Sequence, residues 1–248
     1  MNSQAENLSL RHASIGELVA EDWRRAEVFK KHGIDFCCGG KQTVEAACEQ
    51  KNIDLHQLET ELHEVENEIK FGSQDFNKWE LNFLIDYIIN VHHQYVGEAI
   101  PFLAELTHKV AYTHGDNHPE LIEIEKLFQD VSQELALHMQ KEEMILFPYI
   151  KEMTEARKNG TLPPYPAFGT IANPIHMMEA EHTSAGSAME TIEELSKGFT
   201  PPVDACPSYQ IMFAKLQEFQ QNLHQHVHLE NNILFPKAIQ LEKSFRAS

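Results

Sequence analysis

The chain has 248 residues, 42% of them hydrophobic, which is enough to bury a substantial core and to form two domains. Its 20 Lys and Arg against 38 Asp and Glu give a formal net charge of -18, which argues against a nucleic-acid partner and an anionic membrane surface. No apolar stretch approaches the roughly 20 residues of a membrane helix, and the N-terminus lacks a basic region followed by an apolar run, so we expect a cytoplasmic protein.

Apolar residues recur with helical spacing along the chain, and alternating strand-like runs are missing, so we expect an all-α fold. Residues 1–70 are predicted to form a small N-terminal domain. Its predicted helices are Ile15–Lys31, Val44–Lys51 and Leu55–Lys70. The polar segment 71–77 is predicted to be a linker.

Two adjacent cysteines, Cys37 and Cys38, stand in a Cys-Cys-Gly-Gly loop between the first two predicted helices. Four cysteines in a chain of this length do not suggest a disulfide scaffold, so free thiols are expected. A thiol near a helix N-terminus has a lowered pKa, and we therefore assign Cys37 and Cys38 as candidate catalytic thiols. The alternative is two loop thiols without a task. Cys48 and Cys206 have no comparable context.

Residues 78–248 are predicted to form a second domain of long helices that lie antiparallel in a four-helix bundle, up-down-up-down. The predicted helices are Trp79–Thr107, Pro119–Arg157, Pro174–Ser196 and Tyr209–Lys243. A helix of about 25 residues spans roughly 37 Å, which suffices for such a bundle. Pro101, Pro148 and Pro236 lie inside these stretches and are expected to kink or end them.

A histidine and a glutamate four residues apart recur in the two halves of this bundle. His138-Met-Gln-Lys-Glu142 is repeated 88 residues later as His226-Val-His-Leu-Glu230, and each copy is followed by Ile-Leu-Phe-Pro. Residues four apart project from the same face of a helix. A further histidine precedes each copy at a similar distance: His93, or its neighbour His92, before the first, and His182 before the second.

Four imidazoles and two carboxylates on successive helices predict a metal centre in the bundle core, since buried ionisable groups are costly unless a cation compensates them. Six ligands exceed the four of a structural zinc site, so two metals bridged by the glutamates fit better, with two histidines for each. The donor set suits iron, with manganese or zinc as substitutes. The alternative is a set of ordinary core or surface histidines. The remaining histidines, His114 among them, lack this register and are expected in loops or at the surface.

The chain resembles the Repair of Iron Centers family, whose C-terminal half is a hemerythrin-like di-iron bundle. The resemblance rests on four segments: Asp35–Gln42, His138–Pro148, Met178–His182 and His226–Pro236. It implies a di-iron centre and chooses His93 over His92. It also implies repair of iron-sulfur clusters damaged by nitric oxide or peroxide, with damaged iron-sulfur proteins as partners. The implied metal ligands are His93, His138, Glu142, His182, His226 and Glu230.

One position departs from the oxygen-carrying hemerythrins that the chain also resembles. Those proteins have a second histidine one turn before the third-helix ligand, where this chain has Met178. One ligand fewer leaves the site more open to exchange of water, a small gas or the metal. This favours a reactive or labile centre over a closed oxygen carrier, and we expect an iron-donor protein rather than a turnover enzyme. A protein that binds oxygen or nitric oxide, and a di-iron nitric oxide reductase, are the alternatives, and a homodimer is left open.

Overall fold

The computed structural model describes residues 10–67 and 75–246. Within these residues every regular element is helical, apart from one isolated antiparallel bridge between Ser14 and Thr43. The all-α prediction is therefore confirmed. Across the same residues no helix combines the length and apolar character needed to span a bilayer.

Contacts divide the chain into two compact units. The first comprises Met1–Glu80 with Val227–Gln240, and the second comprises Leu81–His226 with Leu241–Ser248. The division falls at residue 80, close to the expected linker. It also assigns a stretch of the last long helix to the first unit.

The first unit contains short helices, and of the three that the sequence predicts only the first is divided in two. They are α2 (Ile15–Glu21), α3 (Arg25–Lys31), α4 (Val44–Lys51), α5 (Leu55–Asn67) and the 3₁₀ turn η1 (Phe76–Lys78). The predicted helix from Ile15 to Lys31 is thus broken into α2 and α3. Residues 68–70 of the last predicted helix, and 71–74 of the predicted linker, lie outside the described residues.

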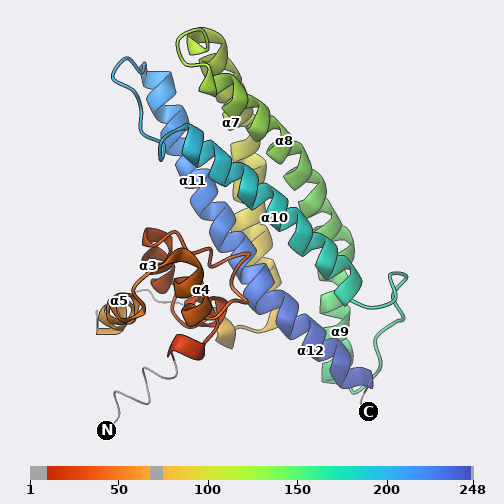
Figure 1. Ribbon diagram of the computed structural model, residues 1–248. Helices are drawn as coiled ribbons and strands as arrows, with labels where there is room; N and C mark the ends of the chain where they lie inside the picture. The colour runs from red at the N-terminus through yellow and green to blue at the C-terminus, as the bar shows by residue number, and fades with distance from the viewer. Residues whose placement is uncertain (1–9, 68–74, 247–248) are drawn as a thin grey trace. The chain divides into compact units, whose positions relative to one another are not determined.

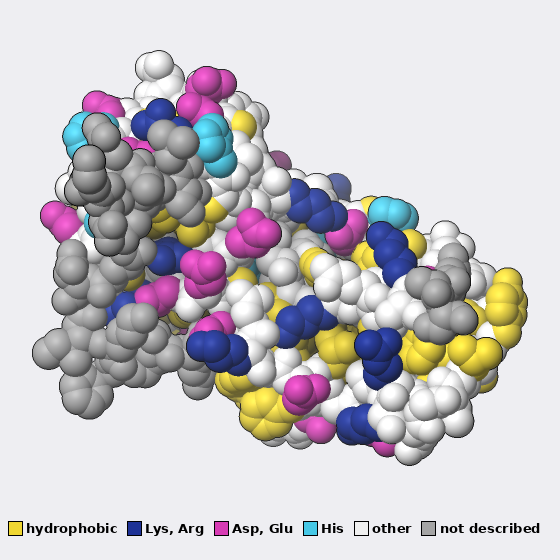
Figure 2. All heavy atoms as spheres, turned by 90° about the horizontal axis from the view of Figure 1, so that it is seen from below, with side chains coloured by type: hydrophobic (Ala, Val, Ile, Leu, Met, Phe, Trp, Pro, Cys, Tyr) yellow, Lys and Arg dark blue, Asp and Glu magenta, His cyan; other side chains and the backbone are white. Residues whose placement is uncertain are grey.

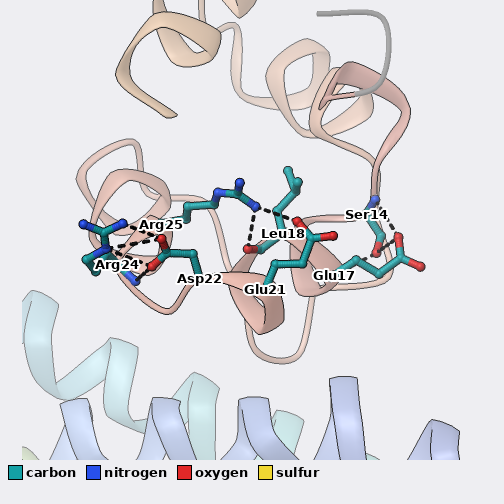
Figure 3. A network of polar contacts seen from close by, with 7 residues as sticks. All are labelled: Ser14, Glu17, Leu18, Glu21, Asp22, Arg24 and Arg25. Carbon is teal, nitrogen blue, oxygen red and sulfur yellow. Dashed lines mark hydrogen bonds and ion pairs between the residues drawn. The ribbon is translucent and has the colours of Figure 1, made fainter. Parts of the chain in front are cut away.

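The break between α2 and α3 is made by local polar contacts that sequence periodicity does not reveal (Figure 3). The Asp22 carboxylate accepts hydrogen bonds from the Arg24 backbone N–H at 3.1 Å and from its guanidinium. The Arg24 side chain thereby holds the pKa of Asp22 below its usual range. Arg25 Nη1 donates to the carbonyl of Leu18 at 3.0 Å and to the Glu21 carboxylate at 2.9 Å. A carboxylate that binds the next backbone N–H groups competes with helical hydrogen bonding, so the chain turns there.

The second unit is built on four long helices that run side by side in Figure 1: α7 (Gln94–His114), α8 (Glu120–Lys141), α10 (Ala172–Leu195) and α11 (Pro207–Leu229). The helical bundle is therefore confirmed. Shorter segments extend these helices: α6 (Leu81–Tyr87), η2 (Ile88–His93), η3 (Glu142–Leu146) and α9 (Phe147–Asn159). The last helical run continues as η4 (Glu230–Leu234) and α12 (Phe235–Arg246), in the stretch that is assigned mainly to the first unit.

Three of the extensions, η2, η3 and η4, are π-helical. The backbone N–H of Phe147 donates to the carbonyl of Glu142, and that of Phe235 donates to Glu230, five residues back in each case. Pro148 and Pro236 come directly after these turns. Proline has no N–H to donate, and the changed hydrogen-bond register of the π turn reduces the cost of that missing hydrogen bond. Neither proline ends its helical run, and α7 continues through Pro101.

Aromatic side chains fill the bundle core. Phe128 and Phe219 are fully buried and meet edge to face, with ring centroids 5.4 Å apart. Burying such a side chain stabilises the fold by about 1.5–3 kcal/mol. Figure 2 shows one face of the surface, where Lys and Arg side chains lie beside Asp and Glu side chains.

Candidate metal centre

The four long helical runs each bring one or two of the predicted ligands into the interior. His93 is the last residue of η2. His138 lies in the last turn of α8, and Glu142, one turn later, is the first residue of η3. His182 lies within α10, and α11 carries His226 one turn before Glu230 opens η4. All six side chains are buried, and the two glutamates are 0% exposed.

The imidazole Nε2 atoms of these histidines meet in pairs. The distance is 3.1 Å between His93 and His226, and 2.9 Å between His138 and His182. One carboxylate oxygen of Glu142 lies 3.5 Å from the Nε2 of His93 and 3.3 Å from that of His138. Glu142 therefore lies between the two pairs.

The six side chains form two overlapping groups of four, within each of which one ligand atom per residue lies within 4.8 Å of all others. The first is His93, Glu142, His226 and Glu230, and the second is His138, Glu142, His182 and Glu230. Two ligands bound to one ion at about 2.1 Å are about 3.0–3.4 Å apart for angles near 90–109°. The observed separations fit that spacing. Each group thus offers two imidazoles and two shared carboxylates, the arrangement that the sequence predicts for two cations.

Carboxylates outside these groups orient two of the histidines. His93 Nδ1 lies 2.7 Å from the Glu143 carboxylate, and His138 Nδ1 lies 2.8 Å from that of Glu181. A carboxylate on Nδ1 fixes the tautomer that leaves Nε2 free to bind metal. Lys141 also pairs with Glu181. Burial opposes ionisation of Glu181, but hydrogen bonds from Lys141 and His138 outweigh it and lower its pKa.

Sequence reasoning missed Glu143 and Glu181 as partners of the ligands. Each is the immediate neighbour of a predicted ligand, in the pairs Glu142-Glu143 and Glu181-His182, and that adjacency is the signal available in the sequence. The sequence does not show which of these neighbouring carboxylates contacts a histidine of another helix. That choice depends on the packing of the bundle.

The adjacent histidines His92 and His93 are both buried, although neighbours on a regular helix point in different directions. His93 belongs to the first metal-binding group. The ring of His92 instead stacks on His226, with centroids 5.7 Å apart and planes 9° from parallel, and its Nδ1 lies 3.3 Å from the Asn222 side-chain oxygen. His92 therefore packs against a candidate ligand, His226, rather than joining either group.

Residues 84–238 match the family described as Hemerythrin HHE cation binding domain. Residues 11–66 match ScdA_N, a domain of unknown function. The iron-sulfur cluster repair proteins YtfE of Yersinia pseudotuberculosis and Yersinia pestis are each 34% identical over 235 residues, covering 95% of this chain and all of theirs. The chain belongs to this family of iron-sulfur cluster repair proteins. The resemblance to the Repair of Iron Centers family is thus confirmed.

The first unit of this family member carries the Cys37-Cys38 loop, between α3 and α4. The Asp35 carboxylate accepts backbone hydrogen bonds from Cys37 at 2.9 Å, Cys38 at 3.0 Å and Gly39 at 2.8 Å. The Cys37 thiol donates to the same carboxylate at 3.1 Å. Cys37 is buried and Cys38 is partly exposed, and together with Asp35 they form a third group that could hold a metal ion.

The expected low pKa of Cys37 is wrong. A hydrogen bond with the Cys38 side chain and burial raise the pKa of Cys37 well above its usual range, and the Asp35 carboxylate adds to the rise. The backbone N–H groups that would stabilise a thiolate donate to that carboxylate instead. Cys37 is therefore held as a neutral thiol.

Residues 227–240, which belong to the same unit, hold this loop through Asn232. Its Nδ2 donates to the carbonyls of Phe36 at 3.2 Å and Cys37 at 3.1 Å. A Cβ on Gly16 or on Gly40 would lie 2.4 Å from the Asn232 side-chain oxygen, so both positions require glycine. The second glycine of the Cys-Cys-Gly-Gly sequence thus serves the close approach of this amide.

The residue in place of the additional hemerythrin histidine, Met178, is buried in α10. It lines a cavity of about 530 Å³ together with apolar side chains that include Leu146 and Phe168. The polar groups at this cavity are Lys141 and Asn173. An apolar cavity therefore adjoins the position at which the sequence predicts an open coordination site.

Proposed function

We propose that this chain holds two iron ions at the six-ligand centre and supplies iron to iron-sulfur clusters damaged by nitric oxide or peroxide in the cytoplasm. The single observation that carries the proposal is that Glu142 and Glu230 each belong to both metal-binding groups. The name of the similar Yersinia proteins, iron-sulfur cluster repair protein, supports the substrate class. The client proteins in this proposal are damaged iron-sulfur proteins.

The donor set also accounts for release of the metal. Two carboxylates neutralise two of the four positive charges of two ferrous ions, and the four imidazoles bind as neutral ligands. A site that leaves half of the charge uncompensated holds its ions less firmly than one with more carboxylates. When bound, the iron pair supplies the ferrous ions that a damaged cluster lacks.

The side chains around the centre have distinct parts in this proposal. Glu143 and Glu181 hold the rings of His93 and His138 in the tautomer that directs Nε2 inward. The Glu181 side chain is 31% exposed and bonded to Lys141, so protons and water can reach His138 from that side. Iron binding then depends on these carboxylates as well as on the ligands.

The thiols have a separate part. We propose that the small N-terminal domain, residues 1–70, uses Cys37 and Cys38 to meet a client cluster or its iron, while the bundle, residues 78–248, stores the metal. Cys38 is the more exposed of the two thiols, and Asp35 adds an oxygen ligand beside them. A thiol must lose its proton to bind iron or to react with an oxidant, so the raised pKa of Cys37 slows both reactions and leaves the partly exposed Cys38 as the thiol that meets a client first.

The test is metal analysis of protein purified without air, followed by incubation with an iron-sulfur enzyme inactivated by nitric oxide. We expect two irons per chain and recovery of the enzyme's activity. His138→Ala, His182→Ala and His226→Ala should each lower the iron content well below that of the wild type. His56→Ala, a change of an exposed histidine, should not. Two irons in all three ligand variants, or no recovery with the wild type, would refute the proposal.

The second candidate function, binding of oxygen or nitric oxide at the irons, is favoured by one observation. The cavity beside Met178 is lined mainly by apolar side chains and adjoins the helix that carries His182. Small uncharged gases partition into apolar cavities, whereas ions do not. Stable, reversible oxygenation of the reduced protein together with an inability to restore a damaged cluster would favour this second function.

A further inference from the structure

A histidine and a cysteine meet at one end of the bundle, away from the metal-binding groups. His114 is the last residue of α7, and Cys206 directly precedes α11. The Cys206 Sγ lies 3.2 Å from His114 Nε2, within hydrogen-bonding distance. His93 and His114 are separated by 21 residues of helix, or about 31 Å at 1.5 Å per residue. Neither residue was assigned a role by its sequence context.

The surroundings hold this pair in place and leave it partly accessible. The His114 ring packs on the buried Tyr209 ring, with centroids 5.6 Å apart. The ring of His118 meets the same Tyr209 ring, with centroids 5.7 Å apart, and its Nε2 lies 3.2 Å from the Asp204 carboxylate. Both His114 and Cys206 are partly exposed. A small solute can therefore reach the sulfur, while Tyr209 limits rotation of the imidazole.

We propose that Cys206 is a nucleophilic thiol that hydroperoxides oxidise, with His114 as the group that takes up and returns its proton. The thiol proton moves to His114 Nε2, and the thiolate attacks one oxygen of the peroxide. The O–O bond breaks, an S–O bond forms, and the leaving hydroxide takes the proton from the imidazolium as water. Sulfur loses two electrons and the peroxide gains two, so that Cys–SH and H₂O₂ give Cys–SOH and H₂O.

The environments of the other cysteines favour Cys206 as the reactive one. Burial, followed by the charges of Glu59 and Asp54, raises the pKa of Cys48, which is buried. Cys37 is buried too and donates to a carboxylate, and the partly exposed Cys38 side chain bonds Cys37 rather than an imidazole. An accessible thiol whose partner is an imidazole is the usual environment of a cysteine that peroxide oxidises, whereas a buried thiol beside a carboxylate reacts slowly with peroxide.

The test uses the full-length protein, brief exposure to hydrogen peroxide, and a dimedone probe that labels sulfenic acid, with mass spectrometry of each cysteine peptide. We expect the Cys206 peptide to be labelled about tenfold or more faster than the Cys48 peptide. His114→Gln keeps a polar side chain but cannot carry the proton, so labelling should slow about tenfold or more. His108→Gln is the matched control, because His108 lies on the same helix and pairs with Glu125 at the surface.

Oxidation by iron and peroxide would affect wild type, His114→Gln and His108→Gln alike, since none of these changes touches the metal-binding groups. The comparison between Cys206 and Cys48 within the wild type needs no variant at all. Cys206 labelled no faster than Cys48 would overturn the proposal. Equal labelling of Cys206 in wild type and in a His114→Gln protein of normal helix and iron content would overturn it as well. These results are independent of cluster repair.

Discussion

Changing Glu142 to Gln tests whether the two metal-binding groups truly share a ligand. Glu142 is fully buried, and one of its oxygens lies 3.5 Å from His93 Nε2 and 3.3 Å from His138 Nε2. A neutral amide of the same shape cannot bridge two cations. Four-ligand protein sites bind structural metals with about 10–16 kcal/mol, or about 2.5–4 kcal/mol per ligand, which is about two to three powers of ten in affinity. Because Glu142 belongs to both groups, both irons should weaken by this factor.

The adjacent residue provides the matched control. Glu143→Gln removes the same charge one position along the chain, but Glu143 lies outside the two metal-binding groups and bonds to the Nδ1 of His93. Loss of such an outer partner costs about 10–100-fold in metal affinity, and here it should affect one iron. The assay is competition with a ferrous chelator without air, with iron per chain measured at each chelator concentration. Loss of only one iron from Glu142→Gln, or equal losses in both variants, would refute the shared-ligand geometry.

Three further predictions address the thiols, the open position and the pH dependence. Cys37→Ser combined with Cys38→Ser should leave two irons and the circular dichroism of the bundle unchanged while cluster repair falls; an equal loss of iron would place these thiols at the metal. Met178→His should slow iron release to a chelator and slow repair with it, and an unchanged release rate would argue against labile iron as the basis of function. A hydrogen bond from Lys31 lowers the pKa of Glu61 to about 2, so its stabilisation is complete above pH about 4.5 and is lost as the pH falls toward 2. In Glu61→Gln, the free energy of unfolding should therefore fall by about 1 kcal/mol less than in the wild type over that pH range, as measured by urea titration at several pH values.

The convergence of the six candidate ligands was predictable because helical geometry converts sequence spacing into direction. A histidine and a glutamate four residues apart must share a face, and two copies in register fix two hairpins of one bundle. The π turns were not predictable in this way. They depend on which carbonyl the N–H of Phe147 or Phe235 selects, a difference of one residue that leaves the apolar pattern unchanged. The two prolines that follow these turns, Pro148 and Pro236, are the visible signal in the sequence. Their presence predicts kinks or helix ends, whereas the structure has π turns before them and continuing helices.

The error over Cys37 has a similar origin. Its position before a helix is visible in the sequence, and so is Asp35, two residues earlier. What the sequence does not show is that the Asp35 carboxylate turns back onto the loop N–H groups and places a negative charge beside the thiol. The helix-terminus argument fails here because α4 begins only at Val44, and because the loop N–H groups nearest the thiol donate to the Asp35 carboxylate.

The duplication that gives the bundle its symmetric ligands also shows where the halves differ. With the offset of 88 residues, Met144 in the first half corresponds to Asn232 in the second. The Met144 side chain is 69% exposed, whereas Asn232 donates to the backbone of the Cys37-Cys38 loop. Both residues stand two positions after a shared glutamate, in equivalent π turns. The same turn therefore carries a glutamate of the metal-binding groups in each half, and at the position two residues later the second half has a side chain that also binds the thiol loop.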